Sequence, residues 1–190
     1  MVLIGLLLMI GAPFAEQMHF TDWWHPHFIF NSFITIEDLL FGFSVGGVIS
    51  AVYSLLNSRI KDDFILPINL TGKILTTTAF LFSVFGLFYI FHIHSFISSI
   101  IALSIPVIIV GYYNKKSLIP IFLTGMFMTV FALAGYLFSI YLNPNFVKET
   151  YLLNHLSKIL ILGIPIEELL WFFFAGMGVS AFQKIIWSEK

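Results

Sequence analysis

Residues 164–182 read IPIEELLWFFFAGMGVSAF, an apolar stretch with two adjacent acids near its start. A helix needs about 20 mostly apolar residues to span the hydrocarbon core of a membrane. No Lys or Arg lies within this stretch to offset Glu167 and Glu168. Acids inside such spans cost roughly 2.5–3.5 kcal/mol at the centre and usually face a cavity or a partner. The stretch therefore predicts a transmembrane helix that carries carboxyl groups toward the protein interior.

The rest of the chain has a matching composition. Of its 190 residues, 59% are hydrophobic and 10% are charged, whereas soluble domains average roughly 45–50% apolar and about 25% charged residues. The net charge of −1 gives no indication of a nucleic-acid partner. The absence of cysteine excludes disulfides and thiolate chemistry. We therefore expect a protein of the lipid bilayer, in which backbone groups must be satisfied within helices.

Six apolar segments meet or approach the length of a span, and Pro-containing or polar breaks separate them. The predicted fold is all-α, a polytopic transmembrane bundle of about six helices. The first segment has no preceding Lys or Arg, so we interpret it as a helix and not as a signal peptide. The predicted segments are Met1–Phe14, Ile29–Leu56, Leu70–Phe91, Phe96–Tyr113, Leu118–Leu142 and Ile159–Ile186.

Basic residues gather on one side of this bundle if all six segments cross. The positive-inside rule then places that side, and both chain termini, in the cytoplasm. Asp62 and Asp63 lie in a charged loop there, and we expect them to be solvated. The basic residues on that side are Arg59, Lys61, Lys73, Lys115, Lys116, Lys184 and Lys190, against only Lys148 and Lys158 on the other.

A second acidic stretch predicts an internal repeat. Residues 34–52 read ITIEDLLFGFSVGGVISAV and align with residues 164–182 at a constant offset of 130 positions, so that Glu37 and Asp38 take the places of the later acidic pair. We predict a first unit over residues 1–57 and a second unit, with additional helices, over residues 58–190. An even number of crossings separates the acidic helices, so they should run in the same direction, as parallel repeats do.

The acidic pairs indicate proton-transfer chemistry. Close carboxyls in apolar surroundings resist ionising together, so at least one should stay protonated at neutral pH and act as a proton donor. Aromatic side chains facing them would stabilise a cation without supplying a nucleophile. The alternative role for either pair is helix capping. The candidate catalytic residues are Glu37, Asp38, Glu167 and Glu168, and the candidate substrate-binding residues are Phe41, Phe43, Trp171, Phe173 and Trp24.

At these residues the sequence resembles the membrane-bound lycopene cyclase domain family of bacteria, archaea and fungi. That family carries a duplicated helix with Pro-x-Glu-Glu followed by Leu and Phe. Residues 164–173 match this pattern closely, and residues 34–43 match it with Thr35 in the Pro place and Asp38 for the second Glu. Residues 12–16 and 22–24 are similar to the family's aromatic-acidic helix end.

The resemblance implies an isomerisation of a long, lycopene-like carotenoid without an obligatory redox cofactor. A carboxylic acid protonates the terminal double bond, the adjacent alkene closes on the cation, and a carboxylate removes a proton to leave a β-ionone-type ring. By motif match the four paired carboxyls form the acid/base set, with donor and acceptor unassigned. Family members consist of one chain or two subunits, so a partner subunit or a second copy stays open. We predict no metal site and no cofactor.

Two other functions remain open at this point, a proton-coupled transporter and a non-catalytic carotenoid-binding subunit. A transporter would need a polar pathway, but Ser, Thr and Asn are sparse near Glu167. An intramembrane protease with a Glu-Glu-x-x-x-Arg motif is excluded, because Phe172 takes the arginine position. A retinal-binding receptor would need a Lys inside a late helix, and the last apolar segment, Ile159–Trp187, has only Lys184, at its end.

Overall fold

The structure is a computed structural model that describes residues 1–26 and 33–187, and it confirms the all-α fold. In this part of the chain, six helices are long and apolar enough to cross a membrane. The elements are α1 (Val2–Asp22), α2 (Ile36–Ile60), α3 (Leu70–Leu81), the π-helical η1 (Phe82–Gly86), α4 (Leu87–Tyr89), α5 (Ser95–Tyr113), the 3-10 turn η2 (Lys115–Ser117), α6 (Leu118–Leu142), α7 (Phe146–Thr150), β1 (Leu160–Ile161), β2 (Ile164–Pro165) and α8 (Ile166–Ile186).

Two predicted boundaries were wrong. The first helix does not end near Phe14, because α1 continues through Pro13 to Asp22. The last does not begin at Ile159, because β1 and β2 form a short antiparallel hairpin there. Its turn uses the positive φ angles of Leu162 (53°) and Gly163 (86°), which a helix excludes. For the predicted segment 29–56, residues 29–32 lie outside the described residues, and the described helix begins at Ile36.

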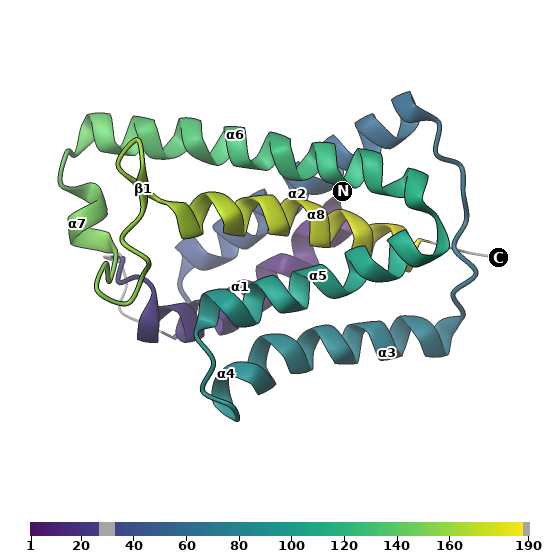
Figure 1. Cartoon of the computed structure of the whole chain (residues 1–190), viewed down its shortest axis with the longest axis horizontal. Helices are drawn as coiled ribbons and strands as arrows, with labels where there is room; N and C mark the ends of the chain where they lie inside the picture. Colours follow the sequence, from purple (N-terminus) through teal and green to yellow (C-terminus); the bar gives the residue numbers. More distant parts are fainter. Residues whose placement is uncertain (27–32, 188–190) are drawn as a thin grey trace.

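Helix α8 lies at the centre of the bundle, between α5 and α6, with α3 on the far side of α5 (Figure 1). It is also the most buried of the six long helices. Helix α1 packs along α2. Helices α2 and α8 run in the same direction (Figure 1), as the number of crossings between them predicts. Their first turns, which carry the acidic pairs, therefore lie at the same end of the bundle.

Glycines allow the closest helix contacts, as small residues do between membrane helices. A Cβ atom added at Gly46 would lie 2.9 Å from the backbone oxygen of Ile4, on α1. At Gly176 it would lie 2.8 Å from Gly125 Cα, on α6. Since Gly46 and Gly176 are 130 positions apart, α1–α2 and α6–α8 use matched contact positions. The internal repeat and the division into units 1–57 and 58–190 stay predictions that these contacts support.

The expectation of a solvated Asp62 was wrong. Its carboxylate accepts a 2.7 Å hydrogen bond from Lys184 Nζ, and both side chains are buried. Asn114 Nδ2 donates to the same carboxylate at 3.3 Å. This ion pair fixes the loop after α2 to the end of α8, far from the acidic pairs. Sequence alone did not indicate the pairing, because 122 positions separate the two residues.

The Asp62 pair predicts a loss of stability in acid. Burial raises the pKa of Asp62. Hydrogen bonds from Lys184 and Ser117, together with the Lys184 charge, lower it by more than burial raises it, so the pKa lies below its usual value. A depressed pKa contributes stability above the unfolded-state pKa of about 3.9, and this contribution is lost as pH falls through the folded-state pKa. In thermal unfolding in detergent, Asp62→Asn should melt several degrees below the wild type at pH 7. The gap should close below about pH 4. An unchanged gap would contradict this assignment.

Candidate functional site

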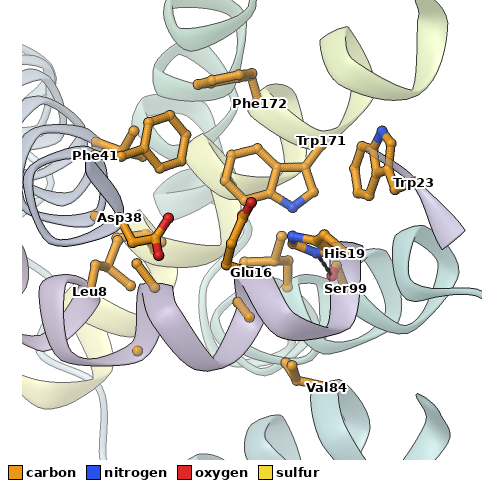
Figure 2. A pocket seen from close by; sticks show the side chains of 18 of the residues that line it. Leu8, Glu16, His19, Trp23, Asp38, Phe41, Val84, Ser99, Trp171 and Phe172 are labelled. Carbon is orange, nitrogen blue, oxygen red and sulfur yellow. Dashed lines mark hydrogen bonds between the residues drawn. The ribbon is translucent and has the colours of Figure 1, made fainter. Parts of the chain in front are cut away.

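A cavity of about 190 Å³ lies inside the bundle. Side chains from α1, α2, α5, α6 and α8 line it, together with α3 and the adjoining π-helical turn η1. Its lining is mostly aliphatic and aromatic, and Figure 2 shows it at close range. Among the described residues that line the cavity there is no Lys or Arg. A positive charge that forms in this space therefore meets carboxyl groups and aromatic faces and no Lys or Arg side chain.

The cavity receives one residue of each acidic pair. Asp38 of α2 and Glu168 of α8 both line it and are only 6% and 5% exposed. Glu37 and Glu167 are not among the lining residues. Successive residues of an α-helix point about 100° apart, so two adjacent acids cannot both face one cavity in the same way. The second member of each pair is the one that reaches the cavity.

Local helix starts explain this shared register. Thr35 is the N-cap of α2, and its hydroxyl accepts a 3.1 Å hydrogen bond from the backbone N–H of Asp38. Pro165 is the residue before α8, where its fixed φ suits a helix start. Asp38 and Glu168 are thus both the third residue of their helix. The Thr-for-Pro difference between the two motifs changes how the helix starts but not where.

Glu168 is held by two tyrosine hydroxyls. Tyr136 on α6 donates a 2.6 Å hydrogen bond to Glu168 Oε2, and the Tyr151 hydroxyl lies 3.0 Å from the Tyr136 hydroxyl. Burial, followed by the nearby Glu168 charge, raises the pKa of Tyr151 well above its usual value, so its hydroxyl keeps its proton. Tyr151 can therefore donate to Tyr136 while Tyr136 donates to Glu168. Neither tyrosine was predicted, since they lie 32 and 17 positions from Glu168 and meet it only in the folded chain.

Glu167 turns away from the cavity toward the preceding loop. Its Oε1 accepts a 2.7 Å hydrogen bond from the backbone N–H of Ser157. This bond fixes the segment between α7 and β1 against the first turn of α8. The Glu167 carboxyl therefore positions the start of α8. This resembles the helix-capping role expected from sequence as the alternative for an acidic pair.

Glu16 is an additional acid in the cavity, outside the predicted catalytic set. It lies on α1, lines the cavity and is 7% exposed. Among the described residues its Oε1 has no hydrogen-bond partner. Residues 12–16 were noted from sequence as similar to the family's aromatic-acidic helix end, but Glu16 was not counted as catalytic, because the first apolar segment was expected to end at Phe14. In the sequence, Glu16 is the first acidic residue after an apolar stretch, and this could have marked it.

One helical turn after Glu16, His19 also lines the cavity. Its Nε2 lies 3.3 Å from Ser99 Oγ on α5, and both side chains are buried. The His19 ring contacts the Trp23 ring edge-on, with centroids 4.9 Å apart. Among the described residues, no three His, Cys, Asp or Glu side chains gather as metal ligands would.

Of the five predicted substrate-binding residues, the structure places three on the cavity, Phe41, Trp171 and Trp24. The rings of Phe41 and Trp171 stack with centroids 6.3 Å apart and an interplanar angle of 26°. Phe43 and Phe173 do not line the cavity. They cover the glycines of the neighbouring helices, since a Cβ added at Gly5 or Gly125 would meet these two residues.

The cavity wall reaches the outer surface of the bundle. Phe41 and Leu81 both line the cavity, and 41% and 47% of their surfaces are exposed. Leu81 immediately precedes η1, and Val84 and Phe85 of that turn are also part of the wall. Single π-helical turns within α-helices are frequent at functional sites. An apolar ligand in the bilayer could thus approach from the side.

These observations define a multi-pass membrane helix bundle with carboxyl groups in an aromatic cavity. Residues 94–186 match the family model described as Lycopene cyclase. No curated protein and no solved structure matches the chain. The matched part holds Tyr136, Tyr151, Glu167 and Glu168. The match confirms the resemblance found at residues 164–173, and it supports a carotenoid cyclase role in general and a carotenoid substrate. Residues 34–43 lie outside the match.

Proposed function

We propose that the chain is a carotenoid end-group cyclase that converts the acyclic ends of a lycopene-like polyene into β-ionone-type rings. The observation that carries this proposal is that Asp38 and Glu168 line the same cavity. Two helices deliver these carboxyls from matched positions into one aromatic cavity that contains no Lys or Arg among its described residues. Two carboxyl groups in such a cavity are suited to adding a proton to a hydrocarbon and removing another.

The proposed reaction is an isomerisation in which atoms and electrons balance. A neutral carboxyl group gives its proton to the terminal double bond, which leaves a tertiary cation. The neighbouring alkene attacks this cation and forms the ring bond. A carboxylate then takes a proton from the ring, and a new double bond forms. One proton is added and one removed, so neither an oxidant nor a reductant is needed.

Of the four carboxyls in the acidic pairs, we propose that Asp38 and Glu168 take part in the proton chemistry of the cavity, because they line it. Glu167 is proposed as a positioning residue through its bond to Ser157. Phe41 and Trp171 would face the cation, since aromatic faces attract positive charge by roughly 0.5–2 kcal/mol. They do so without a lone pair that could capture it.

The cavity volume suits one end group and not a whole carotenoid. Pockets for drug-sized ligands measure roughly 300–1,000 Å³, and this cavity measures about 190 Å³. We propose that the end of the polyene enters past Phe41 and Leu81, whose exposed surfaces mark the way out of the cavity. The rest of the chain would remain in lipid.

Expression in bacteria that accumulate lycopene tests this function. Membranes from these cells should convert lycopene to products with cyclic ends, and membranes from empty-vector cells should not. In D2O each new ring should retain one deuterium, because the added proton stays on carbon while a different one leaves. An uncoupler should not slow conversion, whereas it would stop proton-coupled transport. Unchanged lycopene in membranes that contain the folded protein would refute the proposal and favour a non-catalytic carotenoid binder.

A further inference from the structure

We propose that Glu16 is the proton donor of this reaction, that Asp38 in the same cavity favours the protonated form of Glu16, and that Glu168 is the acceptor. This inference rests on the proposed function and assigns the roles that the motif alone leaves open. It also adds a residue from α1, outside the acidic pairs and outside the part of the chain that matches the family.

Glu16 has the placement of a group that waits for a ligand. It is 7% exposed, it lines the cavity, and among the described residues no hydrogen-bond partner reaches its Oε1. Figure 2 shows the carboxyl groups of Glu16 and Asp38 pointing into the same space beside Trp171. A buried polar atom without a partner costs roughly 1–3 kcal/mol. A role in proton transfer to a substrate would explain why the Glu16 carboxyl oxygen faces the cavity without a partner.

Asp38 makes the arrangement a carboxyl pair. Its Oδ2 is also buried without a hydrogen-bond partner among the described residues. Helices α1 and α2 are packed closely, because a Cβ added at Gly42 would lie 2.5 Å from the backbone oxygen of Leu8. Two carboxyls that face one apolar space cannot both ionise cheaply, so at least one of them keeps its proton. That retained proton is the one available to an incoming double bond.

Glu168, which also lines the cavity, has the surroundings for the other role. Glu168 accepts a hydrogen bond from Tyr136, which Tyr151 supports in turn. Hydrogen bonds donated to a carboxyl group stabilise its ionised form. A carboxylate held in this way is ready to accept a proton from the ring cation. Glu168 thus has a tyrosine hydroxyl bound to its Oε2, whereas one carboxyl oxygen each of Glu16 and Asp38 has no hydrogen-bond partner among the described residues. We infer the direction of proton transfer from this difference.

The protonation states reset between turnovers. After ring formation Glu16 has lost a proton and Glu168 has gained one. Both carboxyls line the same cavity, and once the product leaves they exchange with water, so that Glu16 regains a proton and Glu168 releases one. No external acid is consumed, and the next end group meets the same starting state.

The test compares Glu16→Gln with Glu168→Gln in membranes that convert lycopene with the wild type. Glu16→Gln should copurify with lycopene in wild-type amount but form rings at least about 100-fold more slowly, because a general acid contributes roughly that factor or more. It should give no new products. Glu168→Gln should still protonate some substrate and yield misplaced double bonds or hydroxylated ends. Glu16→Asp, which keeps an acid, should recover at least about tenfold over Gln.

Glu16→Leu removes the unpartnered polar atom and replaces Gln as the test variant if Gln fails to fold. Ring formation above one-tenth of wild type by a folded Gln or Leu variant would overturn the donor role. Misplaced-double-bond products from either variant would also overturn it, because they mark a lost acceptor. Failure of the wild type to form rings would instead refute the proposed function, so the two failures are distinct.

Discussion

Replacing Glu168 with Gln should lower formation of β-type rings by on the order of 1,000-fold, the largest effect that we expect at the site. Gln has nearly the same shape as Glu but cannot accept the proton of the ring cation. General acid–base groups contribute typically 100- to 10,000-fold. Glu168 is buried, and Tyr136 donates to its Oε2 at 2.6 Å. The measurement is the initial rate of ring formation per folded protein in isolated membranes.

Two matched substitutions control this result. Glu149→Gln changes an exposed carboxyl that bonds Asn143 outside the cavity, and it should leave the rate unchanged. Glu167→Gln changes the neighbour of Glu168, which bonds Ser157. It should slow the reaction less than Glu168→Gln, because it alters a helix start and not a reacting group. Equal losses for Glu167→Gln and Glu168→Gln would contradict the assignment of Glu168 to the cavity chemistry.

Replacing Gly176 with Leu should abolish accumulation of folded protein. The position faces α6 so closely that a single Cβ would lie 2.8 Å from Gly125 Cα and 3.0 Å from the Thr124 backbone oxygen. Backbone cannot move aside as a side chain does, so the central helix would separate from α6. Overpacked cores typically lose about 1–3 kcal/mol, and a backbone clash at the bundle centre should exceed that range. The measurement is the monodisperse fraction in detergent.

Neighbouring glycines provide the control for the packing prediction. Gly46→Leu in α2 should fail in the same way, because its Cβ would meet Ile4 and Gly5 of α1. Gly47→Leu should be tolerated, since nothing lies within 4 Å of a Cβ at that position. A folded Gly46→Leu protein, or an unfolded Gly47→Leu protein, would contradict the α1–α2 packing. The pair also tests the predicted repeat, in which Gly46 and Gly176 are equivalent.

Much of the fold was predictable because hydropathy alone sets which segments cross a bilayer. The exact helix ends were not predictable in the same way. Continuation of α1 past Pro13 depends on packing against α2, and the hairpin before α8 depends on backbone angles at Leu162 and Gly163. The orientation with both termini in the cytoplasm, a partner subunit and a homo-oligomer stay predictions.

Part of the candidate site could be predicted, because acidic residues within apolar segments stand out in the sequence. The repeated acidic pairs lie in the first turns of α2 and α8, and of their four carboxyls only Asp38 and Glu168 line the cavity. Which member of a pair faces inward depends on the rotation of each helix, which its neighbours set. Tyr136 and Tyr151 reach Glu168 only through tertiary contacts. No local pattern marks such residues.

The small size of the acid-bearing cavity has a consequence for the order of products. A lycopene-like molecule has two ends, and a space of about 190 Å³ holds one of them. In the proposed reaction, the half-finished molecule would withdraw past Phe41 and Leu81, turn around in the bilayer and return by its other terminus. Monocyclic carotenoid should consequently build up early in a time course, before dicyclic carotenoid overtakes it, and dilution with extra lipid should prolong that stage.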